Sequence, residues 1–142
     1  MTHSVPTKKL RPGLSATIEK VVPLEWTIAH YDPRLPPVFS TPAMIGLMES
    51  AAARAVKPAL PDGAITVGTR IEVDHLKAVP AGARVQFRAR LVGMDGRFLK
   101  FAVEARSRRH VIGRGCVFRA IVETRRFSAR AARRAGRTDK GR

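Results

Sequence analysis

Apolar and polar residues alternate with a period of two along several segments, as expected for strands that have one buried face. The pattern and its bounds predict strands over residues 14–22, 65–76, 83–92, 97–107 and 110–124. Asp95-Gly96 is a hairpin turn signal, and Arg108-Arg109 marks the next turn. We therefore expect the last three strands to form an antiparallel meander in which each strand has an apolar face and an Arg-rich face.

One helix is predicted between the first two strands. Thr41 precedes Pro42, and a threonine N-cap followed by proline at the first helical position is a common helix start. The helix should run to about Lys57, because Pro58 stops it. Apolar residues cover nearly its whole circumference, so the pattern predicts a buried helix wrapped by the sheet. The fold class is α+β, with about five antiparallel strands around one central helix.

The chain of 142 residues suits a single domain. It contains no run of 18 apolar residues, so we expect no membrane-spanning helix. Cys116 is the sole cysteine, which excludes an intramolecular disulfide and a cysteine-rich zinc site. A cytoplasmic location is the default for such a chain. His3, His30 and His110 lack metal-ligand spacing, so no metal site and no cofactor are predicted.

The formal net charge of +16 is concentrated toward the C-terminus, where Asp139 is the one acid among eight bases in residues 125–142. We divide the chain into a flexible N-terminus over 1–12, a domain over 13–128 and a basic, disordered tail over 129–142. A basic tail can bind nucleic acid or an anionic membrane, or can be a solvated end. No aromatic stacking platform accompanies it, which argues against a nucleic-acid partner.

Three polar residues occupy positions where apolar residues would be expected: Glu49 in the helix, His75 near the end of a long strand, and Arg119 in the last strand. A buried carboxylate is costly unless it is paired or protonated. Glu49 therefore needs a partner, and His75 and Arg119 are the candidates by residue type. A structural ion pair and a functional site are both open at this point.

Thr41 is a fourth candidate, although its role as an N-cap would already explain it. Thr41 and Glu49 are eight residues apart, or about 12 Å along a helix axis. The Glu49 side chain leans toward the helix N-terminus, so one imidazole could bridge the hydroxyl and the carboxylate. Hydroxyl, base and orienting acid form the generalised catalytic triad.

Three segments of the chain are similar to those of a known family. Residues 38–49, with the sequence VFSTPAMIGLME, resemble the start of the central helix in hotdog-fold thioesterases of the fluoroacetyl-CoA thioesterase type. Val67-Gly68-Thr69, followed by Val73-Asp74-His75, resembles that family's glycine and histidine segment. The last strand, from Gly113 through Arg119, is also similar, and the resemblance extends over about residues 12–128.

The resemblance implies a hotdog fold, a homodimer with the active site at its interface, and hydrolysis of a small acyl-CoA. It implies catalytic roles for Thr41, Glu49 and His75, and substrate contacts by Gly68, Arg119 and Phe39. The segment before the helix is shorter than in the fluoroacetyl-specific enzyme, and Phe39 is its only phenylalanine. An unspecified small acyl group is therefore expected.

Two other functions fit parts of the sequence. A hotdog protein that binds acyl-CoA or an acyl carrier without turnover would keep the fold, but the intact set of Thr41, Glu49 and His75 argues against this. A nucleic-acid-binding module would use the tail and the Arg-rich sheet face.

Overall fold

The structure, a computed structural model, describes residues 8–140, and for residues 137–140 it describes the backbone alone. Its strands are β1 (Ser15–Val21), β2 (Ala64–His75), β3 (Arg84–Asp95), β4 (Phe98–Ser107) and β5 (His110–Glu123). Its α-helices are α1 (Thr41–Val56) and α2 (Thr124–Lys140), and three short 3₁₀ helices cover Leu24–Trp26, Ile28–His30 and Lys57–Ala59. The predicted strands and central helix are confirmed.

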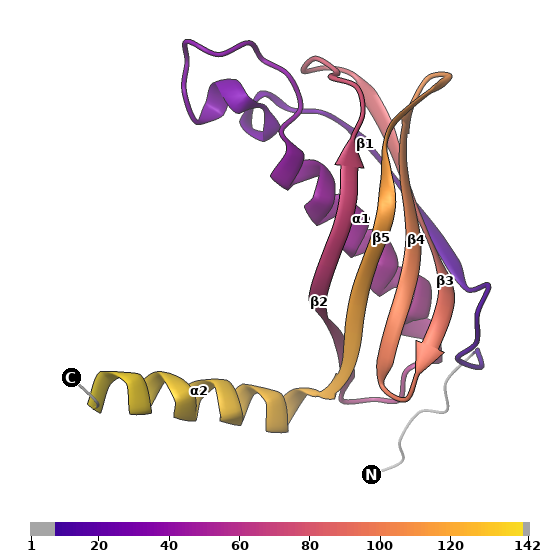
Figure 1. The fold of residues 1–142 in the computed structure, drawn as a ribbon, viewed down its shortest axis with the longest axis vertical. Helices are drawn as coiled ribbons and strands as arrows, with labels where there is room; N and C mark the ends of the chain where they lie inside the picture. Colours follow the sequence, from indigo (N-terminus) through magenta and orange to yellow (C-terminus); the bar gives the residue numbers. More distant parts are fainter. Residues whose placement is uncertain (1–7, 141–142) are drawn as a thin grey trace.

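The five strands form one antiparallel sheet in the order β1-β3-β4-β5-β2. The predicted meander is β3-β4-β5. Strand β2, which follows α1 in the chain, pairs with β5 on the side opposite to β4. Figure 1 shows the sheet curving around α1, which lies across its concave face. Strands β1 and β2 are therefore the two edges, each with one row of backbone groups unpaired within the described chain.

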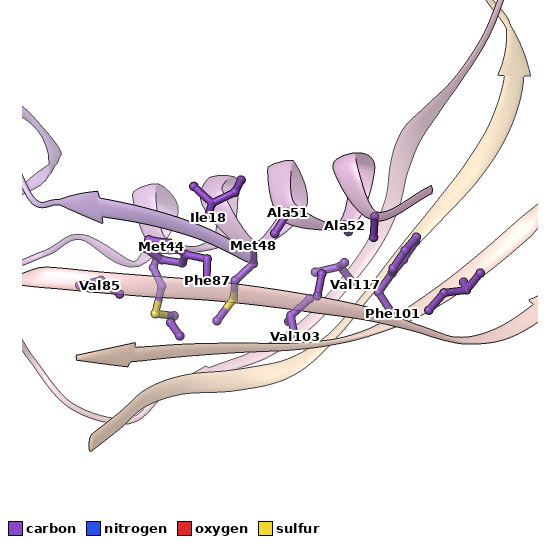
Figure 2. Close-up of a cluster of buried hydrophobic side chains, with 14 of the residues drawn as sticks. Ile18, Met44, Met48, Ala51, Ala52, Val85, Phe87, Phe101, Val103 and Val117 are labelled. Carbon is purple, nitrogen blue, oxygen red and sulfur yellow. The ribbon is translucent and has the colours of Figure 1, made fainter. Parts of the chain in front are cut away.

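The core lies between α1 and the concave face of the sheet. Figure 2 shows the α1 residues directed toward side chains from the strands. Along β3, buried Val85, Phe87, Ala89 and Leu91 alternate with exposed Arg84, Gln86, Arg88 and Arg90, which line the convex face. The labelled core residues are Ile18, Met44, Met48, Ala51, Ala52, Val85, Phe87, Phe101, Val103 and Val117. Burial of these side chains holds the helix in place.

Two expectations about α1 are wrong. Ser40, not Thr41, is the N-cap: its Oγ accepts a hydrogen bond from the Ala43 backbone N–H, and Thr41 is already the first helical residue. The helix is also not buried all round. Its side away from the sheet exposes Pro42, Gly46, Ser50 and Arg54, because the sheet of one chain meets only the other side.

The two ends also differ from the sequence-based prediction. Residues 1–7 and 141–142 of the expected flexible ends lie outside the described residues. Lys8 donates its backbone N–H to the Pro58 carbonyl, and Leu10 packs against the core. The expected disordered tail is instead the helix α2, whose alanines and arginines have high intrinsic helix propensity.

A substitution at Gly115 tests how closely β5 approaches β2. A Cβ at Gly115 would overlap the Glu72 carbonyl oxygen of the neighbouring strand. We expect Gly115→Ala to lower the free energy of unfolding by about 1–3 kcal/mol, as overpacking typically does. A Cβ at Gly93 would lie at an ordinary 3.7 Å from Lys100 Cβ, so Gly93→Ala serves as the control. Urea denaturation that gives equal midpoints for the two variants would contradict this account.

Candidate functional site

The hydroxyl of Thr41 is held by His75. The distance from Thr41 Oγ1 to His75 Nδ1 is 2.8 Å, and the tautomer of the ring decides which atom donates. Ser40 already caps the helix, so the Thr41 hydroxyl is not needed for capping. His75 is the last residue of β2, which places it beside the first turn of α1.

The second ring nitrogen of His75, Nε2, is buried and has no hydrogen-bond partner among the described residues. A buried polar atom without a partner is uncommon and is often found at a functional site. A pocket of about 310 Å³ lies beside the ring, lined by Ile28, Val38, Phe39, Thr41, His75, Leu76, Lys77 and Ala78. Phe39 borders this pocket but is only 2% exposed and contacts Phe87 edge-on.

Glu49 forms an ion pair with Arg119, which was one of its two predicted partners. Arg119 Nη1 donates to Glu49 Oε2 at 2.9 Å. The Arg119 side chain is 10% exposed and that of Glu49 is 31% exposed, so the carboxylate faces an open side of the site. Burial lowers the pKa of the Arg119 guanidinium, and attraction and hydrogen bonding from Glu49 oppose this shift. The pair keeps a carboxylate within the apolar environment of α1.

Thr66 is a residue that the sequence analysis missed. Arg119 Nε donates to Thr66 Oγ1 at 2.9 Å, and Arg119 Nη2 donates to the Thr66 carbonyl at 2.8 Å. All three guanidinium nitrogens therefore have partners, and the side chain is fixed in one orientation. The two-residue alternation of side chains along a strand could have identified it, because it places Thr66 on the same side of β2 as Gly68.

Gly68 leaves the space in which Glu49 lies. A Cβ at this position would overlap Glu49 Oε2 and would lie 3.6 Å from Arg119 Nη1. Gly68 also pairs directly with Arg119 across the β2-β5 ladder. Any larger residue here would displace the carboxylate, so glycine is required by close approach.

A β-bulge in β2 determines which residues share the helix-facing side. The ladder register shifts between Gly68, which pairs with Arg119, and Arg70, which pairs with Phe118. Residues seven apart normally point to opposite faces of a strand. With Thr69 as the extra residue, both Gly68 and His75 point toward α1.

The site residues form two groups within one chain: Thr41 with His75, and Glu49 with Arg119, Thr66 and Gly68. The expected bridge from Thr41 through His75 to Glu49 is not formed in a single chain. Gly68 and His75 are seven positions apart, or about 23 Å along an extended strand. The described residues contain no group of three or more His, Cys, Asp or Glu side chains that could hold a metal ion.

A family model described as fluoroacetyl-CoA-specific thioesterase matches residues 22–125. The fluoroacetyl-CoA thioesterase of Streptantibioticus cattleyicolor is 37% identical over 127 residues, covering 85% of this chain and 91% of that protein. The chain belongs to the fluoroacetyl-CoA-specific thioesterase family. It is thus a thioester hydrolase, as the sequence resemblance implied.

Solved structures agree with this family and its fold. A structure of the fluoroacetyl-CoA thioesterase has a TM-score of 0.82 and 36% identity, covering 89% of this chain and 98% of that one. A hypothetical protein of Thermus thermophilus, described as a thioesterase superfamily member, has a TM-score of 0.86 and 27% identity over 94% of this chain and 99% of its own. A hot-dog-like protein from Thermanaerovibrio acidaminovorans has a TM-score of 0.79 and 24% identity, over 87% and 91% of the two chains. The predicted hotdog fold is confirmed. None of the helices in the described part of this family member has the length and apolarity needed to span a membrane.

Thr66→Val tests whether Thr66 holds Arg119. Loss of the hydroxyl leaves a buried N–H without its partner, so we expect the free energy of unfolding to fall by about 1–2 kcal/mol. Thr66→Ser keeps the hydroxyl and should restore most of this loss. Thr69→Val, at the exposed neighbouring threonine, is the control. A urea midpoint that shifts equally for Thr66→Val and Thr69→Val would show that the hydrogen bond contributes nothing specific.

Proposed function

We propose that this chain hydrolyses the thioester of a small acyl-CoA, with Thr41, His75 and Glu49 as its catalytic residues. The observation that carries the proposal is the hydrogen bond between Thr41 and His75, whose Nε2 is buried beside a pocket and lacks a partner. The family relationship supports the reaction type. One solved structure of the fluoroacetyl-CoA-specific thioesterase, 37% identical to this chain, contains fluoroacetate and CoA.

His75 acts as the general base in this proposal, and its two tautomers correspond to two routes. With the proton on Nδ1, the ring donates to Thr41 Oγ1 and Nε2 accepts a proton from a water that attacks the thioester carbonyl. With the proton on Nε2, Nδ1 accepts the Thr41 proton and Oγ1 attacks instead. In both routes the C–S bond breaks and the protonated imidazole returns its proton to the CoA sulfur. The second route then needs water to cleave the acyl-threonine ester.

Glu49 provides negative charge that stabilises the imidazolium or orients the attacking water. Arg119 and Thr66 hold this carboxylate in position, and Gly68 leaves room for its oxygen. The substrate carbonyl lies against Gly68 in this proposal, as the family resemblance implied. Arg119 was expected to bind substrate; its three partnered nitrogens favour a positioning role for it here. We propose no preference for the fluoroacetyl group, because Phe39 is buried among core residues and the only other aromatic residue between Thr27 and Phe39 is the exposed Tyr31.

We propose that a homodimer completes this site. The outer edge of β2 has no strand partner in the described chain, and Ile65 and Ile71 on this strand are 41% and 37% exposed. Antiparallel pairing of two β2 strands, about a two-fold axis near Ile71 and Glu72, covers that edge in both protomers. It brings the partner's His75 toward Gly68 of β2, beside which Glu49 of α1 lies. The two groups of site residues then meet across the interface.

His75→Ala and Glu49→Gln test the catalytic assignment. We expect each variant to lower kcat for the best acyl-CoA substrate by about 10²-fold or more, since positioned proton transfer contributes about 10²–10⁴-fold. His110→Ala, at an exposed histidine, should retain activity. A screen over short, branched and aromatic acyl-CoAs, with release of free thiol as the readout, supplies the substrate. Near-normal turnover by a folded His75→Ala variant would refute the assigned role.

Ile71→Lys tests the proposed interface. A charge at the centre of a paired strand edge opposes association, so light scattering at micromolar concentration should show a monomer for this variant and a dimer for the parent chain. It should also lose hydrolysis, because the site needs both protomers. Val92→Lys is the matched control, since Val92 and Ile71 are equally exposed at 37% and Val92 lies on an internal strand. A parent chain that is monomeric and active would contradict the dimeric site.

A further inference from the structure

The helix α2 has no role in the thioesterase site described above. It follows β5 directly, and Figure 1 shows it extending away from the sheet beyond the edge formed by β2. Its residues from Arg125 to Gly136 are exposed. Five arginines lie between residues 125 and 134, and no acidic residue occurs in the helix before Asp139. The helix is therefore a projecting cationic surface.

The start of α2 is fixed by the side chain that precedes it. Glu123 Oε1 accepts the Arg125 backbone N–H at 3.2 Å, and Oε2 accepts the Arg126 backbone N–H at 2.8 Å. These hydrogen bonds lower the pKa of Glu123, so the capping carboxylate is charged near neutral pH. A lone helix of this length is only marginally stable in water. A bound partner would therefore stabilise it.

Three arginines of α2 share one face, and Arg125 and Arg134 lie on its two flanks. Arg126, Arg130 and Arg133 follow the i, i+4, i+7 spacing of a single helix face, over about 10 Å of helix axis. The opposite face carries Ser128, Ala131, Ala132 and Ala135, and Phe127, which is 42% exposed, lies at its border beside Arg134. Insertion into a membrane surface requires several large apolar residues on that face, so the composition favours a phosphate-rich partner over a lipid bilayer.

We propose that α2 binds duplex DNA through the phosphate backbone. Guanidinium groups are well suited to phosphate oxygens, and an α-helix fits the major groove of B-form DNA. Duplex binding does not depend on stacked aromatic rings, whose absence argued against nucleic acid at the sequence level. The ordered stripe of arginines, which a disordered tail would not present, changes that judgement. Recognition is electrostatic and independent of base sequence.

Fluorescence anisotropy with a labelled 20-base-pair duplex of arbitrary sequence, measured at several salt concentrations, tests this proposal. The full-length triple variant R126Q/R130Q/R133Q should bind at least about tenfold more weakly at low salt. The slope of log K against log salt should fall by about 3, since each phosphate contact contributes about 0.9. The matched control is R88Q/R90Q/R114Q, which removes the same charge from the exposed convex face of the sheet and should bind within about threefold of the parent.

A second variant separates the helix from its charge. Ala131→Pro retains every arginine but interrupts α2, and it should also weaken duplex binding. Acyl-CoA hydrolysis should be unchanged in all three variants, which keeps this test independent of the proposed catalytic residues.

Four results would overturn the proposal. The first is an equal loss of duplex binding in the triple variant and in its control. The second and third are tighter binding of single-stranded than of duplex DNA, and binding of phosphatidylserine vesicles in place of DNA. The fourth is dissociation of the proposed dimer by the triple variant.

Discussion

The burial of one face of α1 against the concave sheet is the constraint on which the rest of the structure depends. Met44, Met48, Ala51 and Ala52 are fully buried against side chains from the strands. Their burial sets the height and rotation of the helix, and therefore the positions of Thr41 at its start and Glu49 in its middle. Small residues along this face let the backbone of the helix approach the sheet closely. Without that approach, Thr41 could not reach His75, and Glu49 could not reach Arg119.

A carboxylate on such a helix imposes requirements on the strands beside it. Glu49 is paired with Arg119, Arg119 is held by Thr66, and Gly68 leaves room for the carboxylate oxygen. The carboxylate thus accounts for the arginine and the glycine, and the arginine accounts for the threonine. The ion pair is thus consistent with both interpretations considered from the sequence: it satisfies a buried charge, and it presents an oriented carboxylate at a partly open position. The 31% exposure of the Glu49 side chain leaves the carboxylate accessible from the open side of the site, which a purely structural pair does not require.

The single extra residue in β2 places both groups of site residues on the same side of the sheet. The bulge at Thr69 changes the side-chain alternation, so that Gly68 and His75 both face α1. It also leaves the two groups of candidate site residues near the two ends of an edge strand. An isologous interface along this edge would combine the ends of the two strands twice, which explains how a small domain can carry a two-part site.

Local patterns in the sequence determined the strands, the central helix, the meander and the residue types of the candidate site. These follow from hydrophobic periodicity, proline positions and polar residues in apolar surroundings, all of which act over short distances along the chain. Tertiary structure alone decided that Ser40 caps the helix and frees Thr41, and that Thr66 holds Arg119, because several groups compete for each hydrogen bond. It alone decided the pairing of Glu49, since Arg119 lies across from Gly68 beside Glu49, whereas His75 lies at the other end of β2 beside Thr41. The prediction of a disordered tail was wrong for a related reason. High helix propensity favours a helix, whereas high charge favours disorder. The Glu123 side chain that caps α2 is in place only where β5 ends, so the tertiary structure decides between the two.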